Sequence, residues 1–140
     1  MNVKIIGFTS FCIGVILIAL LVVADHFPSF PGTIGNPTAS EILNGNQDAD
    51  IIKFEGLIYS NVTDHDWLPI SDLKKGDMVG EIKKKTSSSW FFRNLYATKL
   101  AKGTELYLDE GDSYKKGNAP HYLIIVQEDK KQIYQSLREG

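Results

Sequence analysis

Hydrophobic residues are distributed unevenly along the chain, and the longest uncharged run comes first. Residues 5–24 contain no charged side chain and directly follow Lys4. A helix of this length, at about 1.5 Å of rise per residue, covers about 30 Å, the thickness of the hydrocarbon core of a bilayer. Residues 1–24 are therefore predicted to be a transmembrane anchor or a signal peptide.

The charges on either side of this run set its expected orientation. Lys4 and the amino terminus precede the run, and Asp25 follows it. Because positive charge stays in the cytoplasm, we expect everything after Ala24 to lie outside. Cleavage after Ala24 would instead release a secreted protein. The run is longer than a usual signal peptide and stays bulky over 17–23, which favours a single-pass anchor retained in the cell membrane.

Residues 25–49 have the composition of a linker, with frequent Pro, Gly, Ser, Thr and Asn. Within them, Thr38 and Glu41 have the spacing of a capping box, in which each side chain accepts a hydrogen bond from the other residue's backbone. Two apolar residues follow, and Gly45 is typical of a helix end. We expect a helix of one or two turns that could dock on the domain.

The remaining residues, 50–140, show mostly the short patterns typical of strands. Turn residues divide them into five expected strands, at 51–59, 78–85, 104–108, 121–127 and 132–137. The fourth is a continuous apolar run, as expected for a central strand buried on both faces, and a turn at 128–131 makes it a hairpin with the fifth. The predicted fold is mainly β, a small antiparallel sheet or partly open barrel of about five strands.

Two segments of this domain depart from a simple strand pattern. In the first strand, Ile52, Phe54 and Ile58 are expected to share a face, and Gly56 predicts a bulge or a close backbone approach. Residues 89–101 fit two structures equally well. They could break a strand, or they could form a helix that Ser89 caps.

Charge and cysteine content narrow the classes of partner. Residues 50–140 carry fourteen acidic and fourteen basic residues, which gives no general attraction for nucleic acid. The basic residues are concentrated between 71 and 102, where there are eight of them against three acidic ones.

The single cysteine, Cys12, lies in the apolar run, so the exported part has no disulfide. This suits a bacterial exterior better than a small secreted animal domain.

Two short motifs in the domain have counterparts in known proteins. One reads Gly103-Thr104-Glu105-Leu106-Tyr107 and closes the segment 97–107. The other reads Met78-Val79-Gly80-Glu81-Ile82. Together they resemble segments of small exported proteins of Gram-positive bacilli, many of them lipoproteins or single-span proteins of uncharacterised function. That group usually has proline at the position of Ala101 and often a lipid-bearing cysteine in place of the plain span. The resemblance implies an extracytoplasmic, β-rich protein and brings no catalytic residues.

The densest group of potential metal ligands is Asp64, His65 and Asp66. Two carboxylates and an imidazole could hold a divalent ion or polarise a water, as in a small metal-dependent hydrolase. Adjacent residues seldom all point at one centre, so a polar turn between two strands is the simpler interpretation and is favoured here.

The best binding candidate is a basic segment followed by aromatic residues. It consists of Lys83, Lys84, Lys85, Trp90, Phe91, Phe92 and Arg93. The lysines could meet anionic lipid headgroups, wall polymers or an acidic protein surface, while the aromatic rings supply buried area. Alternatively, the lysines protect an edge strand and the aromatic residues fill the core. Joint exposure of the three aromatic residues would favour binding.

These patterns predict a non-catalytic binding module, tethered outside a membrane by residues 5–24, with no cofactor. Its partner would be a protein, a peptide, or an anionic wall polymer or lipid, and not nucleic acid. The alternatives are the hydrolase centred on Asp64, His65 and Asp66, and a secreted protein released by cleavage after Ala24.

Overall fold

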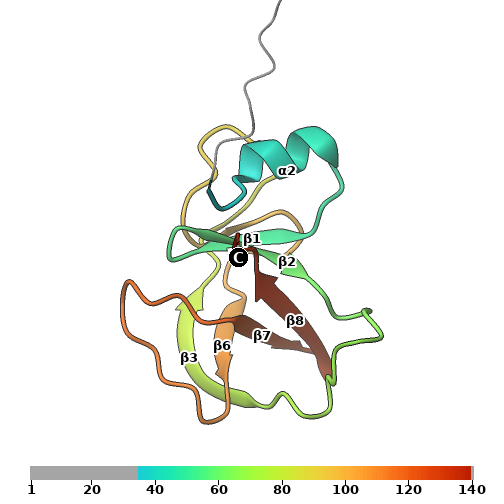
Figure 1. The fold of residues 1–140 in the computed structure, drawn as a ribbon, viewed down its shortest axis with the longest axis vertical. Coiled ribbons are helices and arrows are strands. Elements are labelled where there is room, and N and C mark those ends of the chain that lie inside the picture. The colour runs from blue at the N-terminus through green and yellow to red at the C-terminus, as the bar shows by residue number, and fades with distance from the viewer. Residues whose placement is uncertain (1–34, 140) are drawn as a thin grey trace, which may run out of the picture. The chain divides into compact units, whose positions relative to one another are not determined.

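The computed structural model describes residues 35–139, which form one curled β-sheet with a single short helix (Figure 1). The expected span at 5–24, cleavage after Ala24 and the first part of the linker lie outside the described residues. Among residues 35–139, no helix is long and apolar enough to cross a membrane.

The prediction of a mainly β fold is confirmed, with eight strands in place of about five. The strands are β1 (Ile51–Phe54), β2 (Leu57–Asn61), β3 (Lys75–Glu81), β4 (Lys84–Lys85), β5 (Tyr96–Ala97), β6 (Glu105–Asp109), β7 (Tyr122–Gln127) and β8 (Lys130–Ser136). They form one half-barrel sheet in the order β3-β6-β7-β8-β2-β1-β5-β4. All neighbouring pairs are antiparallel except β4 and β5, which run parallel.

The two edge strands of this sheet, β3 and β4, are consecutive in the chain and are joined by Ile82 and Lys83. The backbone N–H of Ile82 donates to Thr104 on the β6 side at 2.8 Å, and that of Lys83 donates to Leu95 on the β5 side, also at 2.8 Å. The side chain of Ile82 is fully buried. The connection therefore brings the two edges toward one another and curls the sheet around its core.

The prediction of one strand over 51–59 is wrong, because the chain reverses at Glu55 and Gly56. Both residues have positive φ, 49° and 79°, as in the two-residue turns that close β-hairpins. Residues opposite each other in a hairpin share a face, so Ile52 pairs with Tyr59 toward one side. Ile58 pairs with Lys53 and faces the other side, away from Ile52.

The predicted hairpin of 121–127 with 132–137 is confirmed, with its second strand beginning already at Lys130. β7 and β8 pair antiparallel from Tyr122 to Gln127, and the turn residues Glu128 and Asp129 have positive φ. Leu123 and Ile125 belong to one buried cluster and Ile124 to another, which matches a strand buried on both faces.

Three buried clusters lie against this sheet. The central cluster contains Ile52, Phe54, Tyr59, Ile82, Ala97, Leu100, Leu106, Leu123, Ile125 and Tyr134. The helix cluster contains Ala39, Leu43, Ile51, Ile58 and Phe92. The third cluster contains Val62, Leu68, Tyr107, Ile124 and Ile133. The hairpin of β1 and β2 contributes to the first two clusters, so it connects the core of the sheet to the helix.

The short helix, α2 (Ala39–Gly45), confirms the predicted capping box. The backbone N–H of Thr38 donates to the Glu41 carboxylate at 2.7 Å, and that of Glu41 donates to the Thr38 hydroxyl at 3.3 Å. Ala39 and Leu43 are buried in the helix cluster. Since these side chains pack on the β1–β2 hairpin, the helix within the predicted linker forms part of the folded unit.

Residues 89–101 form turns around the two-residue strand β5, with no helix. A helix would place Phe92 and Leu100 on one face, but they pack in different clusters. Leu95 has a φ of 64°, in the left-handed region that a right-handed helix excludes.

Candidate binding surface

The chain between β4 and β5 carries the most exposed aromatic pair among residues 35–139. Trp90 is 77% exposed and Phe91 75%, and their ring centroids are 6.4 Å apart. We call this pair the aromatic tip. Two large neighbouring rings left in solvent mark an interaction site more often than a scattered hydrophobic residue does.

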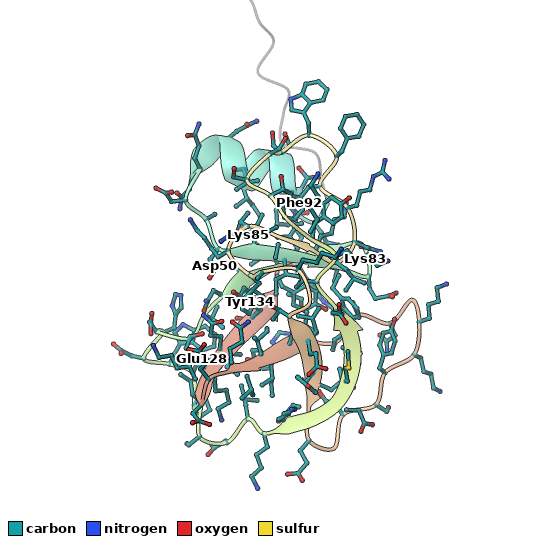
Figure 2. All side chains as sticks on the ribbon, turned by 180° about the vertical axis from the view of Figure 1, so that it is seen from behind. Asp50, Lys83, Lys85, Phe92, Glu128 and Tyr134 are labelled. Carbon is teal, nitrogen blue, oxygen red and sulfur yellow. The ribbon has the colours of Figure 1, made fainter. Side chains whose placement is uncertain are left out.

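Phe92 lies next to the aromatic tip but is buried, with 6% exposure. Its ring packs in the helix cluster with Leu43 and meets Tyr96 edge-on, at a centroid distance of 6.3 Å. Figure 2 shows Phe92 pointing into the region beneath α2. The three aromatic residues are therefore not exposed together. Phe92 fills the core, as in the alternative interpretation, and supports the two rings that face solvent.

The aromatic tip has an unusual backbone. Phe91 has a φ of 59°, in a region that bulky residues rarely occupy. Two hydrogen bonds fix the flanking chain. The Lys53 ammonium donates to the Phe92 carbonyl at 3.3 Å, and the Leu95 N–H donates to the Lys53 carbonyl at 2.6 Å. Strain of this kind persists only where the surroundings enforce it, and it is concentrated at functional sites.

A surface pocket of about 440 Å³ adjoins the aromatic tip. It is lined by Lys84, Thr86, Ser88, Trp90, Phe91, Arg93 and Tyr96. The Lys84 ammonium lies 5.8 Å from the centroid of the Tyr96 ring, within cation–π range. The lining combines two cations, three hydroxyl groups and three aromatic rings, a composition suited to an anionic group with an apolar neighbour.

Two cations, Lys84 and Arg93, line this pocket, and Lys83 and Lys85 flank Lys84 in the chain; all four are exposed. The salt bridges within residues 35–139 join Lys74 to Glu110 and Lys99 to Asp48, so none of the four is held by a carboxylate there. In Figure 2, Lys83 and Lys85 lie in the same half of the domain as Phe92, on either side of it in this view, and Glu128 lies in the other half.

The lysines also occupy a sheet edge. β4 consists of Lys84 and Lys85 and is the last strand in the sheet order. Charged residues on such a strand oppose pairing with another chain. The same two lysines are therefore placed both to protect this edge and to contact a partner.

Sequence reasoning missed three residues of the pocket, Thr86, Ser88 and Tyr96. An alternation could have revealed the first two. Thr86, Ser88 and Trp90 line this pocket, whereas Ser87 and Ser89 line a second hollow of about 450 Å³ that α2 borders through Leu43. This period of two is typical of extended chain. The loop thus runs beside α2, as Figure 1 shows.

The metal-site candidates Asp64, His65 and Asp66 lie in an exposed loop after β2. The loop begins as a polar turn, in which the Asn61 side chain accepts from the backbone N–H of Thr63 at 2.9 Å. The His65 ring lies against Trp67, at a centroid distance of 5.7 Å. Across residues 35–139, no group of three or more His, Cys, Asp or Glu side chains is placed to hold a metal ion.

The comparisons with known proteins found no match. No protein-family model, no curated protein and no solved structure is similar to the chain. The most distinctive part of the described surface is the aromatic tip with the cations near it.

Proposed function

We propose that the chain is a non-catalytic binding module held outside a cell membrane by residues 5–24. Its binding surface consists of the aromatic tip with Lys83, Lys84, Lys85 and Arg93, while Phe92 supports the surface from beneath. The observation that carries this proposal is the exposure of Trp90 and Phe91 on a fixed, strained turn beside the cations Lys84 and Arg93.

The energetics of the turn favour binding over a purely structural role. A bulky residue in the left-handed region costs about 1–3 kcal/mol. Phe91 bears this cost while its ring stays 75% exposed, so burial within the domain offsets little of it. Aromatic rings contribute strongly when an interface buries them, at about 150–250 Å² per side chain. A partner that covers both rings would supply the missing stabilisation.

The location rests on the sequence of the first 25 residues. An uncharged run long enough for a bilayer follows Lys4, and Asp25 follows the run. A single-pass anchor with a cytoplasmic amino terminus would keep the domain at the outer face. The resemblance of 78–82 and 97–107 to exported proteins of Gram-positive bacilli supports the same location.

Photo-crosslinking in cells that express the full chain tests this surface. A photoreactive phenylalanine analogue replaces Phe91 in one variant and Trp67, which is 56% exposed, in the control. We expect position 91 to form adducts with a lipid, wall polymer or protein at several times the yield of position 67. The paired change Lys84→Gln and Lys85→Gln should lower that yield. Equal yields at positions 91 and 67 would refute the proposed surface.

A further inference from the structure

We propose that the partner of this surface is the anionic lipid of the membrane that anchors the chain, with the aromatic tip inserted among the headgroups. This inference rests on the proposed function, whose binding surface it assigns to one class of partner. It is supported by where the chain enters the domain, by the reach of the linker and by the shape of the aromatic tip.

The chain enters the domain beside the helix cluster. The Gly35 N–H donates to the Glu139 carboxylate at 2.8 Å, and the Glu139 N–H donates to the Asn36 side chain at 3.0 Å. Leu137 packs against the helix cluster, which also contains Phe92. The first described residues are therefore bonded to Glu139, two residues after Leu137, whose side chain packs on the cluster that contains Phe92.

The length of the linker limits how far this end of the domain can lie from the expected span. Ten residues, 25–34, separate the expected span from Gly35. Fully extended, they reach about 33–36 Å, because each residue spans at most about 3.3–3.6 Å. Tethering over so short a distance gives the tip a millimolar effective concentration at the membrane surface, so even weak insertion would be populated.

The chemistry of the tip matches the interface of an anionic membrane. Tryptophan concentrates at the headgroup level, where its ring is buried and its N–H stays hydrated. Each lysine or arginine near an anionic surface strengthens binding by roughly fivefold. Lys84 and Arg93 are exposed beside the tip, and Lys83 and Lys85 are exposed on the chain that flanks Lys84. The Thr86 hydroxyl lines the adjoining pocket and could donate to a lipid phosphate, while the Ser88 hydroxyl donates to the Trp90 carbonyl at 3.5 Å.

The shape of the tip favours lipid over a sugar polymer. The planes of the Trp90 and Phe91 rings are tilted by 49°, so they offer no common flat platform for a sugar ring. Both rings project into solvent, with more than 70% exposure each. A projecting pair fits a deformable lipid phase, because acyl chains and headgroups can move around it.

The fluorescence of Trp90 in the full chain reconstituted into vesicles tests this insertion. The sequence has two tryptophans, so Trp67→Phe leaves Trp90 as the only one, and Trp90→Phe leaves Trp67 as the control. The vesicles contain phosphatidylcholine alone or with one quarter phosphatidylglycerol, and brominated acyl chains serve as quencher. In the anionic vesicles, we expect a blue-shifted Trp90 emission that is quenched at least twice as strongly as that of Trp67.

Charge removal and crosslinking separate the possible outcomes. Lys84→Gln with Lys85→Gln should lower Trp90 quenching several-fold in anionic vesicles and change little in neutral ones. Trp90 quenching no stronger than that of Trp67 would overturn lipid insertion. If position 91 then still crosslinks to a protein or wall polymer, the binding surface stands with another partner. If it crosslinks to nothing, the proposed function fails as well.

Discussion

Gly76 in β3 is the glycine at which adding one methyl group should lower the free energy of unfolding most. A Cβ there would lie 2.9 Å from the carbonyl oxygen of Asp109 and 3.1 Å from the Cα of Glu110, both backbone atoms. This backbone is fixed, since the Glu110 N–H donates to Lys74 at 2.8 Å and the Lys74 N–H donates to the Asp109 carboxylate at 2.7 Å. We expect Gly76→Ala to lower the free energy of unfolding by about 1–3 kcal/mol, as for other overpacked sites.

The matched control is Gly45→Ala, and urea denaturation measures both variants. Gly45 is the last residue of α2, and nothing lies within 4 Å of a Cβ at that position. Alanine there should change stability little or raise it by up to about 1 kcal/mol, because it restricts the unfolded chain and favours the helix. Equal urea midpoints for the two variants would show that β3 can move away from the β6 backbone.

The aromatic residues show what sequence could not resolve at this scale. Trp90, Phe91 and Phe92 are consecutive large rings, and their spacing does not indicate which is buried. The left-handed backbone of Phe91 makes the choice, since it leaves Phe92 to pack under α2 while the other two face solvent. Sequence identified the segment as a binding candidate, but the division of roles depends on one dihedral angle.

Among the elements, hairpins show why strand prediction succeeded in one place and failed in another. The turn at Glu128 and Asp129 follows a long apolar run and is surrounded by charge, so it was predictable. The turn at Glu55 and Gly56 lies inside an apolar pattern, and Gly56 read equally well as a bulge. A two-residue turn hardly disturbs the alternation of apolar and polar positions along the chain. The reversal of the chain at this turn is fixed instead by long-range pairing, such as that of β2 with β8.

Glu55 also fastens the loop between β6 and β7, which gives this element a predicted pH response. Its carboxylate accepts from the Tyr114 hydroxyl at 2.5 Å and from the Gly117 N–H at 2.7 Å. The Tyr114 bond, followed by the Gly117 bond, lowers the pKa of Glu55 below its ordinary value of 4.5. The stabilisation is therefore complete above pH 4.5 and is lost as the pH falls through the lowered pKa.

Glu55→Gln removes this titration, so the variant should lose less stability than the parent chain between pH 5 and 3. Urea midpoints across that range measure the slope, and the NMR shift of the Gly117 amide reports the loop directly. Glu110→Gln is the control, because Glu110 makes only an exposed ion pair with Lys74, at 3.7 Å. An exposed pair contributes little, so this variant should keep the parent's slope. If the Gly117 amide shift of the parent chain did not change between pH 5 and 3, the Glu55 carboxylate would not be holding this loop.

For the folded unit as a whole, the helix cluster joins segments that are far apart in sequence. It combines α2, the hairpin of β1 and β2, and Phe92 beneath the aromatic tip, with Leu137 packed against it. The capped helix and most strands were predictable because they follow from local spacing. The strand order, and the placement of the consecutive strands β3 and β4 at opposite edges of the sheet, were not predictable, because they depend on contacts between distant residues.

This arrangement predicts energetic coupling between the helix and the tip. Leu43→Ala should cost about 2–5 kcal/mol, as is usual for a buried leucine. Because Phe92 shares its cluster, a double-mutant cycle of Leu43→Ala with Phe92→Leu should deviate from additivity by about 0.5–3 kcal/mol. The control cycle pairs Leu43→Ala with Ile124→Val in the third cluster, and should be additive within about 0.5 kcal/mol. Additivity in both cycles would mean that α2 and the tip fold independently, and the helix would then not support the binding surface.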